Sequence, residues 1–133
     1  MNMSSYAGYP NGQPEMTVIG LMSGTSLDSI DAACINLKMA SSRPPQLSKF
    51  EVAGTLTLEF NTVLREQLFK IMQEPTVPLD TLCRLNHDVG HQFATAAQLL
   101  IQKVKAKGHT VDLIASHGQN FGMGVTFTME VFL

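Results

Sequence analysis

The chain has 133 residues, of which 44% are hydrophobic and 15% are charged, so it can bury one core of ordinary domain size. Its formal net charge of -2 provides no basic face, which argues against a nucleic-acid partner. No apolar run approaches the roughly 20 residues that a membrane helix needs, so we expect no membrane span.

Residues 1–16 are small and polar, with neither a basic cluster nor an apolar core, and therefore do not resemble a secretory signal peptide. We expect them to be a flexible leader in front of the folded part. The two cysteines, Cys34 and Cys83, lie far apart in sequence and in apolar surroundings. We predict that both are buried, reduced thiols, as in a protein of the cytoplasm.

Three successive segments have the apolar patterns of β-strands. The first covers residues 17–22, and the second, residues 31–38, is almost continuously apolar, which indicates burial on both faces. The third, residues 47–60, alternates, so one of its faces should be less buried. The large apolar residues that share one parity in this third segment are Phe50, Val52, Leu56, Leu58 and Phe60. Short links between the segments predict an antiparallel meander.

Two helices are predicted next. Asn61 is a favourable N-cap, and residues 62–73 have apolar side chains at helical spacing. Pro75 and Pro78 separate this helix from a longer one that starts at Leu79. In the longer helix an apolar residue recurs at every third or fourth position, which predicts one buried stripe. The stripe consists of Leu82, Leu85, Val89, Phe93, Ala96, Leu100 and Val104.

A fourth strand is predicted at residues 111–115, with a loop at residues 116–120. Because this strand follows helices, it should run parallel to a neighbour through a right-handed crossover. The order β-β-β-α-α-β predicts an α/β fold. Residues 121–133 end on an apolar stretch without a closing element. We therefore interpret residues 17–120 as a partial lobe, and residues 121–133 as an atypical tail produced by truncation or a shifted reading frame.

The segment between the first two strands has the composition of a phosphate-binding turn. Gly24 permits close approach of the backbone, its hydroxyl-bearing neighbours can bind oxygen, and successive turn amides can form an anion-binding nest. Asp28 and Asp31 are suited to orienting Mg²⁺ through its waters. The segment matches neither the Walker A nor the dinucleotide-binding pattern. The alternative is an ordinary hairpin turn whose serine and aspartate side chains cap its own amides.

Three separated motifs together resemble the anhydro-N-acetylmuramic acid kinase family. They are Gly20-x-Met22-Ser23-Gly24-Thr25-Ser26-Leu27-Asp28-x-x-Asp31, Leu85-Asn86-x-x-x-Gly90 and Asp112-Leu113-Ile114-Ala115-Ser116-His117-Gly118-Gln119. This family belongs to the superfamily of two-lobed, actin- and hexokinase-like ATPases, so the resemblance implies an incomplete ribonuclease H-like lobe. It also implies a set of nucleotide-binding residues, namely Gly24, Thr25, Ser26, Leu27, Asp28, Ser29, Ile30 and Asp31.

The reaction that the resemblance implies is ATP-dependent phosphorylation of 1,6-anhydro-N-acetylmuramic acid, with ring opening to N-acetylmuramic acid 6-phosphate, in cell-wall sugar recycling. ATP and Mg²⁺ are the implied cofactors, and the resemblance also implies that intact members form homodimers. The family's aspartate base and most of the adenosine pocket lie in later segments, so we expect this chain alone to be inactive. Ser29 replaces a usual glycine. Two alternatives remain: a non-catalytic nucleotide- or sugar-binding module, and a non-functional truncated product.

Two further groups of polar residues have the composition of ligand sets. Ser116, His117 and Gln119 follow the fourth strand, where α/β sheets place ligands, and are candidates for binding the sugar. The alternative is that His117 caps the strand end. His87 and His91 share a helix face as in some zinc enzymes, but the Glu and third ligand of such sites are missing. We therefore predict a solvated polar face there.

Overall fold

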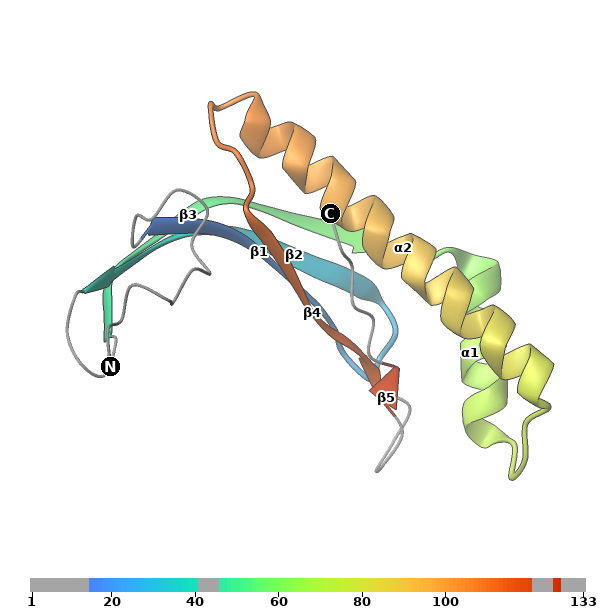
Figure 1. The fold of residues 1–133 in the computed structure, drawn as a ribbon. Coiled ribbons are helices and arrows are strands. Elements are labelled where there is room, and N and C mark those ends of the chain that lie inside the picture. Colours follow the sequence, from blue (N-terminus) through green and yellow to red (C-terminus); the bar gives the residue numbers. More distant parts are fainter. Residues whose placement is uncertain (1–14, 41–45, 121–125, 128–133) are drawn as a thin grey trace.

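The computed structural model describes residues 15–40, 46–120 and 126–127. These form one mixed sheet and two helices, of which the longer packs against the sheet and the shorter packs against the longer helix (Figure 1). In chain order the elements are β1 (Glu15–Ser23), β2 (Ser29–Ala40), β3 (Gln46–Glu59), α1 (Thr62–Gln73), α2 (Leu79–Lys105), β4 (Leu113–Asn120) and β5 (Thr126–Phe127). The predicted α/β fold and the order β-β-β-α-α-β are confirmed, and the two-residue β5 follows.

The sheet has the strand order β3-β2-β1-β4-β5, so β1 is its central strand. β1 and β2 form an antiparallel hairpin that runs from the pair Glu15 and Lys38 to the pair Ser23 and Ile30. β3 pairs antiparallel with β2, which confirms the meander, and β4 pairs parallel with β1, as the crossover rule predicts. β1 thus has a neighbour on each side up to the point where it meets the turn.

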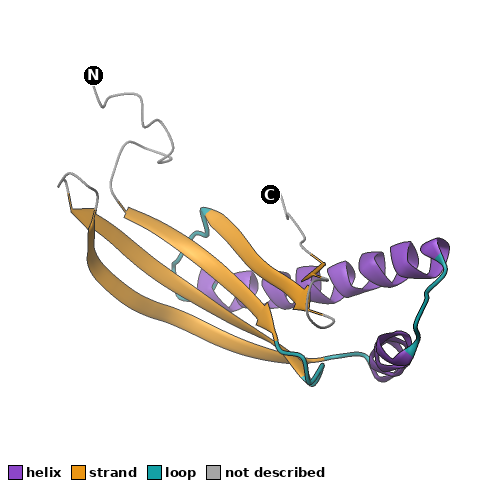
Figure 2. Ribbon diagram, turned by 90° about the horizontal axis from the view of Figure 1, so that it is seen from below, coloured by secondary structure: helices purple, strands orange, loops and turns teal. Residues whose placement is uncertain are grey.

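The hydrophobic core lies between the sheet and α2, which crosses the sheet obliquely (Figures 1 and 2). The apolar stripe of α2 is buried from Leu85 to Val104, as its spacing predicts. The end of α2 comes especially close to β3 at Gly54, where an added Cβ would lie 3.0 Å from the Val104 Cγ1 atom. Gly54 therefore allows the helix to approach the sheet at this point.

Side-chain hydrogen bonds hold the start of α1 and the C-terminal end of α2 in place. The Asn61 side chain accepts a hydrogen bond from the Leu64 amide at 3.1 Å, which confirms the predicted N-cap of α1. At the C-terminal end of α2, the ammonium groups of Lys103 and Lys107 donate to the carbonyls of Thr55 and Ala53 in β3, at 2.8 and 3.2 Å. These lysines tie the C-terminal end of α2 to the sheet. Neither described helix offers an apolar stretch long enough to cross a membrane.

The β3 strand departs from the single buried parity expected for it. Its register against β2 shifts between Gly54 and Val52, so that the strand carries one extra residue at Ala53. Because successive side chains alternate between faces, the extra residue moves the first half of the strand to the opposite face. Phe50 and Val52 are consequently 56% and 52% exposed.

One cysteine prediction is correct and the other is wrong. Cys34 is buried in β2, and burial raises the pKa of its thiol. Cys83 is exposed, because it lies beside the apolar stripe of α2 and not on it. The expected leader and tail lie largely outside the described residues, although β1 already begins at Glu15.

Candidate phosphate-binding site

The turn between β1 and β2 has a defined backbone conformation. The amide of Leu27 donates to the carbonyl of Gly24 at 3.2 Å, which closes a β-turn. Leu27 has a φ of 54°, a left-handed conformation that is uncommon for a residue other than glycine. Its side chain is fully buried in the core. Burial of this side chain therefore helps to hold the turn in a conformation that its own backbone disfavours.

The tip of the turn is open to solvent and has unused donors. Gly24, Thr25 and Ser26 are exposed. Within the described residues, the amides and hydroxyls of Thr25 and Ser26 make no hydrogen bond. A Cβ added at Gly24 would meet only the Ser26 Oγ atom, at 3.7 Å, so the packing of the chain itself does not require glycine there. Free amides, free hydroxyls and open space beside the glycine backbone are the features that a phosphate oxygen needs.

The remaining predicted nucleotide-binding residues differ in what their side chains can reach. Ile30 is fully buried, and like Leu27 it can offer only backbone groups to a ligand. Asp31 lies in β2, where its Oδ1 atom accepts a hydrogen bond from the Thr57 hydroxyl at 2.7 Å. Ser29 is half-buried at the start of β2. Asp28 is exposed and belongs to the turn itself. The assignment of these residues to a nucleotide stays a prediction.

Arg65, in the first half of α1, contacts the turn and was missed by the sequence reading. Its Nε atom donates to the Leu27 carbonyl at 2.9 Å, and its Nη2 atom donates to the Asp28 Oδ1 atom at 2.7 Å. The segment from β1 to β2 contains no lysine or arginine before Lys38, and Arg65 brings a cation to the turn from α1. No local sequence signal identifies this residue, because only the packing of α1 brings it to the turn.

The residues predicted to contact the sugar lie within β4, and not in the loop that we expected. β4 continues to Asn120 because its parallel pairing with β1 resumes after an irregularity: Leu21 pairs with Ser116, and Ser23 then pairs with Gln119. Gly118 lies in this irregularity with a φ of 75°. The extra residue of β4 takes up the mismatch and lets the strand run alongside β1 as far as the turn.

Of these three residues, the structure brings Gln119 directly to the turn. Gln119 is fully buried, and its Nε2 atom donates to the Gly24 carbonyl at 3.1 Å. Its Oε1 atom and the Oγ atom of its strand partner Ser23 are buried without a hydrogen-bond partner among the described residues. His117 is exposed, and the Ser116 hydroxyl accepts from the Gly118 amide at 3.0 Å. Gln119 therefore supports the turn from within the sheet, and the side chain of His117 is exposed to solvent.

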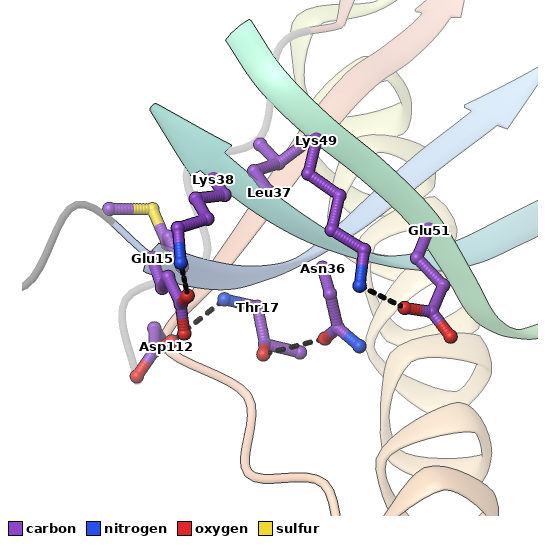
Figure 3. Close-up of a pocket in the computed structure, with 9 residues that line it drawn as sticks. Glu15, Thr17, Asn36, Leu37, Lys38, Lys49, Glu51 and Asp112 are labelled. Atoms are coloured by element: carbon purple, nitrogen blue, oxygen red, sulfur yellow. Dashed lines mark hydrogen bonds and ion pairs between the residues drawn. The ribbon is translucent and has the colours of Figure 1, made fainter. Parts of the chain in front are cut away.

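A polar cavity of about 320 Å³ lies at the opposite end of β1 from the turn (Figure 3). Its charged side chains pair with one another: Lys38 with Glu15 at 2.6 Å, and Lys49 with Glu51 at 3.2 Å. The Lys38 ammonium, as hydrogen-bond donor and as charge, lowers the pKa of the Glu15 carboxyl. The Asp112 carboxylate accepts from the Thr17 amide at 2.8 Å. Since these groups satisfy one another, the turn is the better candidate site.

The histidine pair of α2 lies on an exposed side of the helix. The Nε2 atoms of His87 and His91 are 3.3 Å apart, and the two rings meet edge to face. Among the described residues, no three His, Cys, Asp or Glu side chains are grouped so that they could hold a metal ion. The pair has the geometry of a mutual hydrogen bond between neighbouring turns of a helix.

The fold and the turn together define a class of protein. A mixed sheet, whose central hairpin ends in a turn with free donors and whose parallel strand follows two helices, is consistent with an ATPase-like lobe. The family model described as anhydro-N-acetylmuramic acid kinase matches residues 16–131. The chain belongs to the anhydro-N-acetylmuramic acid kinase family.

Curated relatives from distant bacteria agree with this assignment. The chain is 34% identical over 106 residues to an anhydro-N-acetylmuramic acid kinase of Hydrogenovibrio crunogenus. The aligned region covers 80% of this chain and 27% of the relative. The chain is 38% identical over 104 residues to that of Streptomyces avermitilis, covering 78% and 26%. It is 41% identical over 102 residues to that of Xanthomonas oryzae pv. oryzae, covering 76% and 26%. The chain thus spans about a quarter of the length of these relatives.

Proposed function

We propose that this chain forms the phosphate-binding part of a kinase that uses ATP to phosphorylate 1,6-anhydro-N-acetylmuramic acid and opens its anhydro ring, giving N-acetylmuramic acid 6-phosphate. One observation carries the proposal: in a member of this family, the amides and hydroxyls of Thr25 and Ser26 in the β1–β2 turn have no hydrogen-bond partner among the described residues. The kinase family implies ATP as the phosphate donor. Recycling of cell-wall sugar is the corresponding role.

The turn would act by position and charge, which dominate catalysis of phosphoryl transfer. The Thr25 and Ser26 amides bind phosphate oxygens, and Gly24 lets the phosphate approach the backbone closely. Exposed Asp28 would hold hydrated Mg²⁺, because this ion usually keeps several of its waters. Asp31 is the second carboxylate proposed for this role. When bound, Mg²⁺ neutralises charge on the transferred phosphoryl group.

The sugar would bind near the end of β4. His117 is exposed there and can donate to a sugar hydroxyl or to the lactyl carboxylate. Ser116 and Gln119 were expected in the same role. We propose a supporting role for Gln119 instead, since its side chain is buried and donates to the Gly24 carbonyl.

This chain alone is proposed to bind nucleotide without turning it over. It spans about a quarter of the length of its relatives, and the family resemblance implies an aspartate base in a later segment. We propose a leader at residues 1–16, whose last two residues already belong to β1, a partial lobe at 17–120 and an atypical tail at 121–133. We further propose a cytoplasmic protein whose intact relatives pair as homodimers.

The experiment that tests the function is titration of the full chain with Mg-ATP and Mg-ADP by calorimetry, with Gly24→Ala as the variant. We expect measurable binding by the wild type and weaker binding by Gly24→Ala, whose fold should be intact because the added Cβ makes only one ordinary contact. Absence of binding would refute the proposed role of the turn. Turnover of anhydrosugar at the rate of a full-length relative would refute the partial-lobe proposal. Absence of a cooperative melting transition would favour the truncated-product alternative.

A further inference from the structure

The shape of the turn depends on a residue outside it. Leu27 has its left-handed backbone and Asp28 follows directly, so these two positions set how the turn leads into β2. Inside the turn, one backbone hydrogen bond closes it, from Leu27 to Gly24. A conformation that is disfavoured for leucine persists only if its surroundings enforce it.

Arg65 is placed to enforce it. One guanidinium donates both to the Leu27 carbonyl and to the Asp28 carboxylate, at 2.9 and 2.7 Å. The guanidinium also lies over the ring of Phe69, with its central carbon 5.1 Å from the ring centroid. α1 itself is fixed in this position by its Asn61 cap and by burial of Leu64 and Leu68. Because α1 is fixed, Arg65 holds Leu27 and Asp28 at a fixed position relative to this helix.

The same contact changes the charge at the turn. Asp28 and Asp31 are both acidic, and an unpaired carboxylate repels a phosphate chain. Arg65 pairs with the Oδ1 atom of Asp28 and leaves its Oδ2 atom available to accept from water. A single arginine thus offsets one negative charge and still permits Asp28 to orient a hydrated cation.

We propose that Arg65 is a positioning residue of the phosphate site, which fixes the turn through the Leu27 carbonyl and the Asp28 carboxylate. The inference rests on the proposed function of the turn as a phosphate site. Lysine should replace arginine poorly, because a single ammonium group cannot reproduce the rigid fork that reaches both acceptors. Arg84 is a matched control: it is a half-exposed helix arginine whose partners, Gln67 and Asp88, lie away from the turn.

The test is amide hydrogen exchange of the full chain, followed by NMR, in Arg65→Ala, Arg65→Lys and Arg84→Ala. In Arg65→Ala we expect the Leu27 amide to exchange about tenfold faster, because the turn opens locally, while amides in the middle of α2 keep their rates. Arg65→Lys should fall between Arg65→Ala and the wild type. Arg84→Ala should leave Leu27 unchanged. An unchanged Leu27 amide in Arg65→Ala, or an equal change in Arg84→Ala, would overturn the proposal.

Binding of Mg-ATP provides a second readout that separates this inference from the proposed function. If the wild type binds, we expect the dissociation constant to rise roughly tenfold in Arg65→Ala and to stay constant in Arg84→Ala. Binding that Arg65→Ala leaves unchanged would contradict the positioning role. If the wild type does not bind, the phosphate function fails, and the exchange rates still decide whether Arg65 fixes the turn.

Discussion

The two faces of the sheet are built from the same strands and have very different surroundings. On the face towards α2, Ile19, Ala32 and Cys34 are at most 3% exposed. On the opposite face, which we call the open face, Met22 is 54% exposed and Leu113 is 48% exposed, and an apolar hollow surrounds Gly20 and Ala33. The face towards α2 is the covered face. A sheet that is apolar on both sides is usually covered on both sides. Because the chain spans about a quarter of its relatives, we expect the second cover to come from chain that those relatives possess.

The largest expected difference between the faces is in the cost of removing a side chain. Leu100→Ala removes a fully buried residue of α2 and should lower the free energy of unfolding by about 2–5 kcal/mol. Met22→Ala on the open face should change it by less than about 0.5 kcal/mol. Urea denaturation of both variants measures the difference. Similar losses would mean that the open face is covered in solution.

Substitution of a glycine on each face by valine should change the stability of the chain in opposite directions. Gly54→Val places methyl groups against Val104 on the covered face and should destabilise the chain by about 1–3 kcal/mol. Gly20→Val adds a side chain where no atom lies within 4 Å, and valine suits a strand better than glycine, so we expect a gain of up to about 1 kcal/mol. Thermal unfolding at one pH gives both values. A destabilising Gly20→Val would show that something occupies the open face.

The two thiols test how firmly the covered face is closed. Exposed Cys83 should react at once with a thiol reagent at pH 8, and buried Cys34 should react at least about a hundredfold more slowly, since reaction requires opening. Because burial raises the pKa of Cys34, the folded chain retains a proton that the unfolded chain loses. Stability should therefore fall as pH rises above the thiol pKa of the unfolded chain, and Cys34→Ala should remove that part of the pH dependence. Equal reaction rates of both thiols would contradict a closed core.

The smallest effect is expected at the end of the sheet far from the turn, where charges face solvent. The pKa of Glu15 is lowered by its hydrogen bond and charge interaction with Lys38. Its contribution to stability should be present above the pKa of the unfolded chain and be lost as pH falls through the lower folded value. An NMR titration should show the Glu15 carboxyl returning to an ordinary pKa in Lys38→Met. A persistent shift would indicate another cause.

Local sequence signals predicted those parts of the molecule that depend on local interactions. The Asn61 cap, the stripe of α2 and the β1–β2 hairpin are each encoded within a few neighbouring residues, and the structure has all three. Cys83 was misplaced because apolar neighbours in sequence do not ensure a position on the buried stripe. The strand irregularities at Ala53 and Gly118 depend on the register of a neighbouring strand, which no local pattern reveals.

The candidate site shows the same division. The free donors of Thr25 and Ser26 follow from the composition of the turn. Arg65 and Gln119, which also hold the turn, come from α1 and β4, and only the packed structure brings them there. Gln119 was singled out from the sequence for a different reason, as a sugar ligand.

The central place of β1 has a consequence for how the chain folds. β1 meets β2 across a short turn, but it meets β4 only after a separation of 95 residues, as in the contact between Gly24 and Gln119. Hairpins form within about 1–10 μs, whereas contacts this distant in sequence are slow to form because loop closure costs entropy. On the ribosome, β1 therefore waits with an unpaired edge until both helices and β4 have been synthesised. Until β4 is present the turn lacks its contact with Gln119, so the candidate site is among the last parts of the chain to take shape.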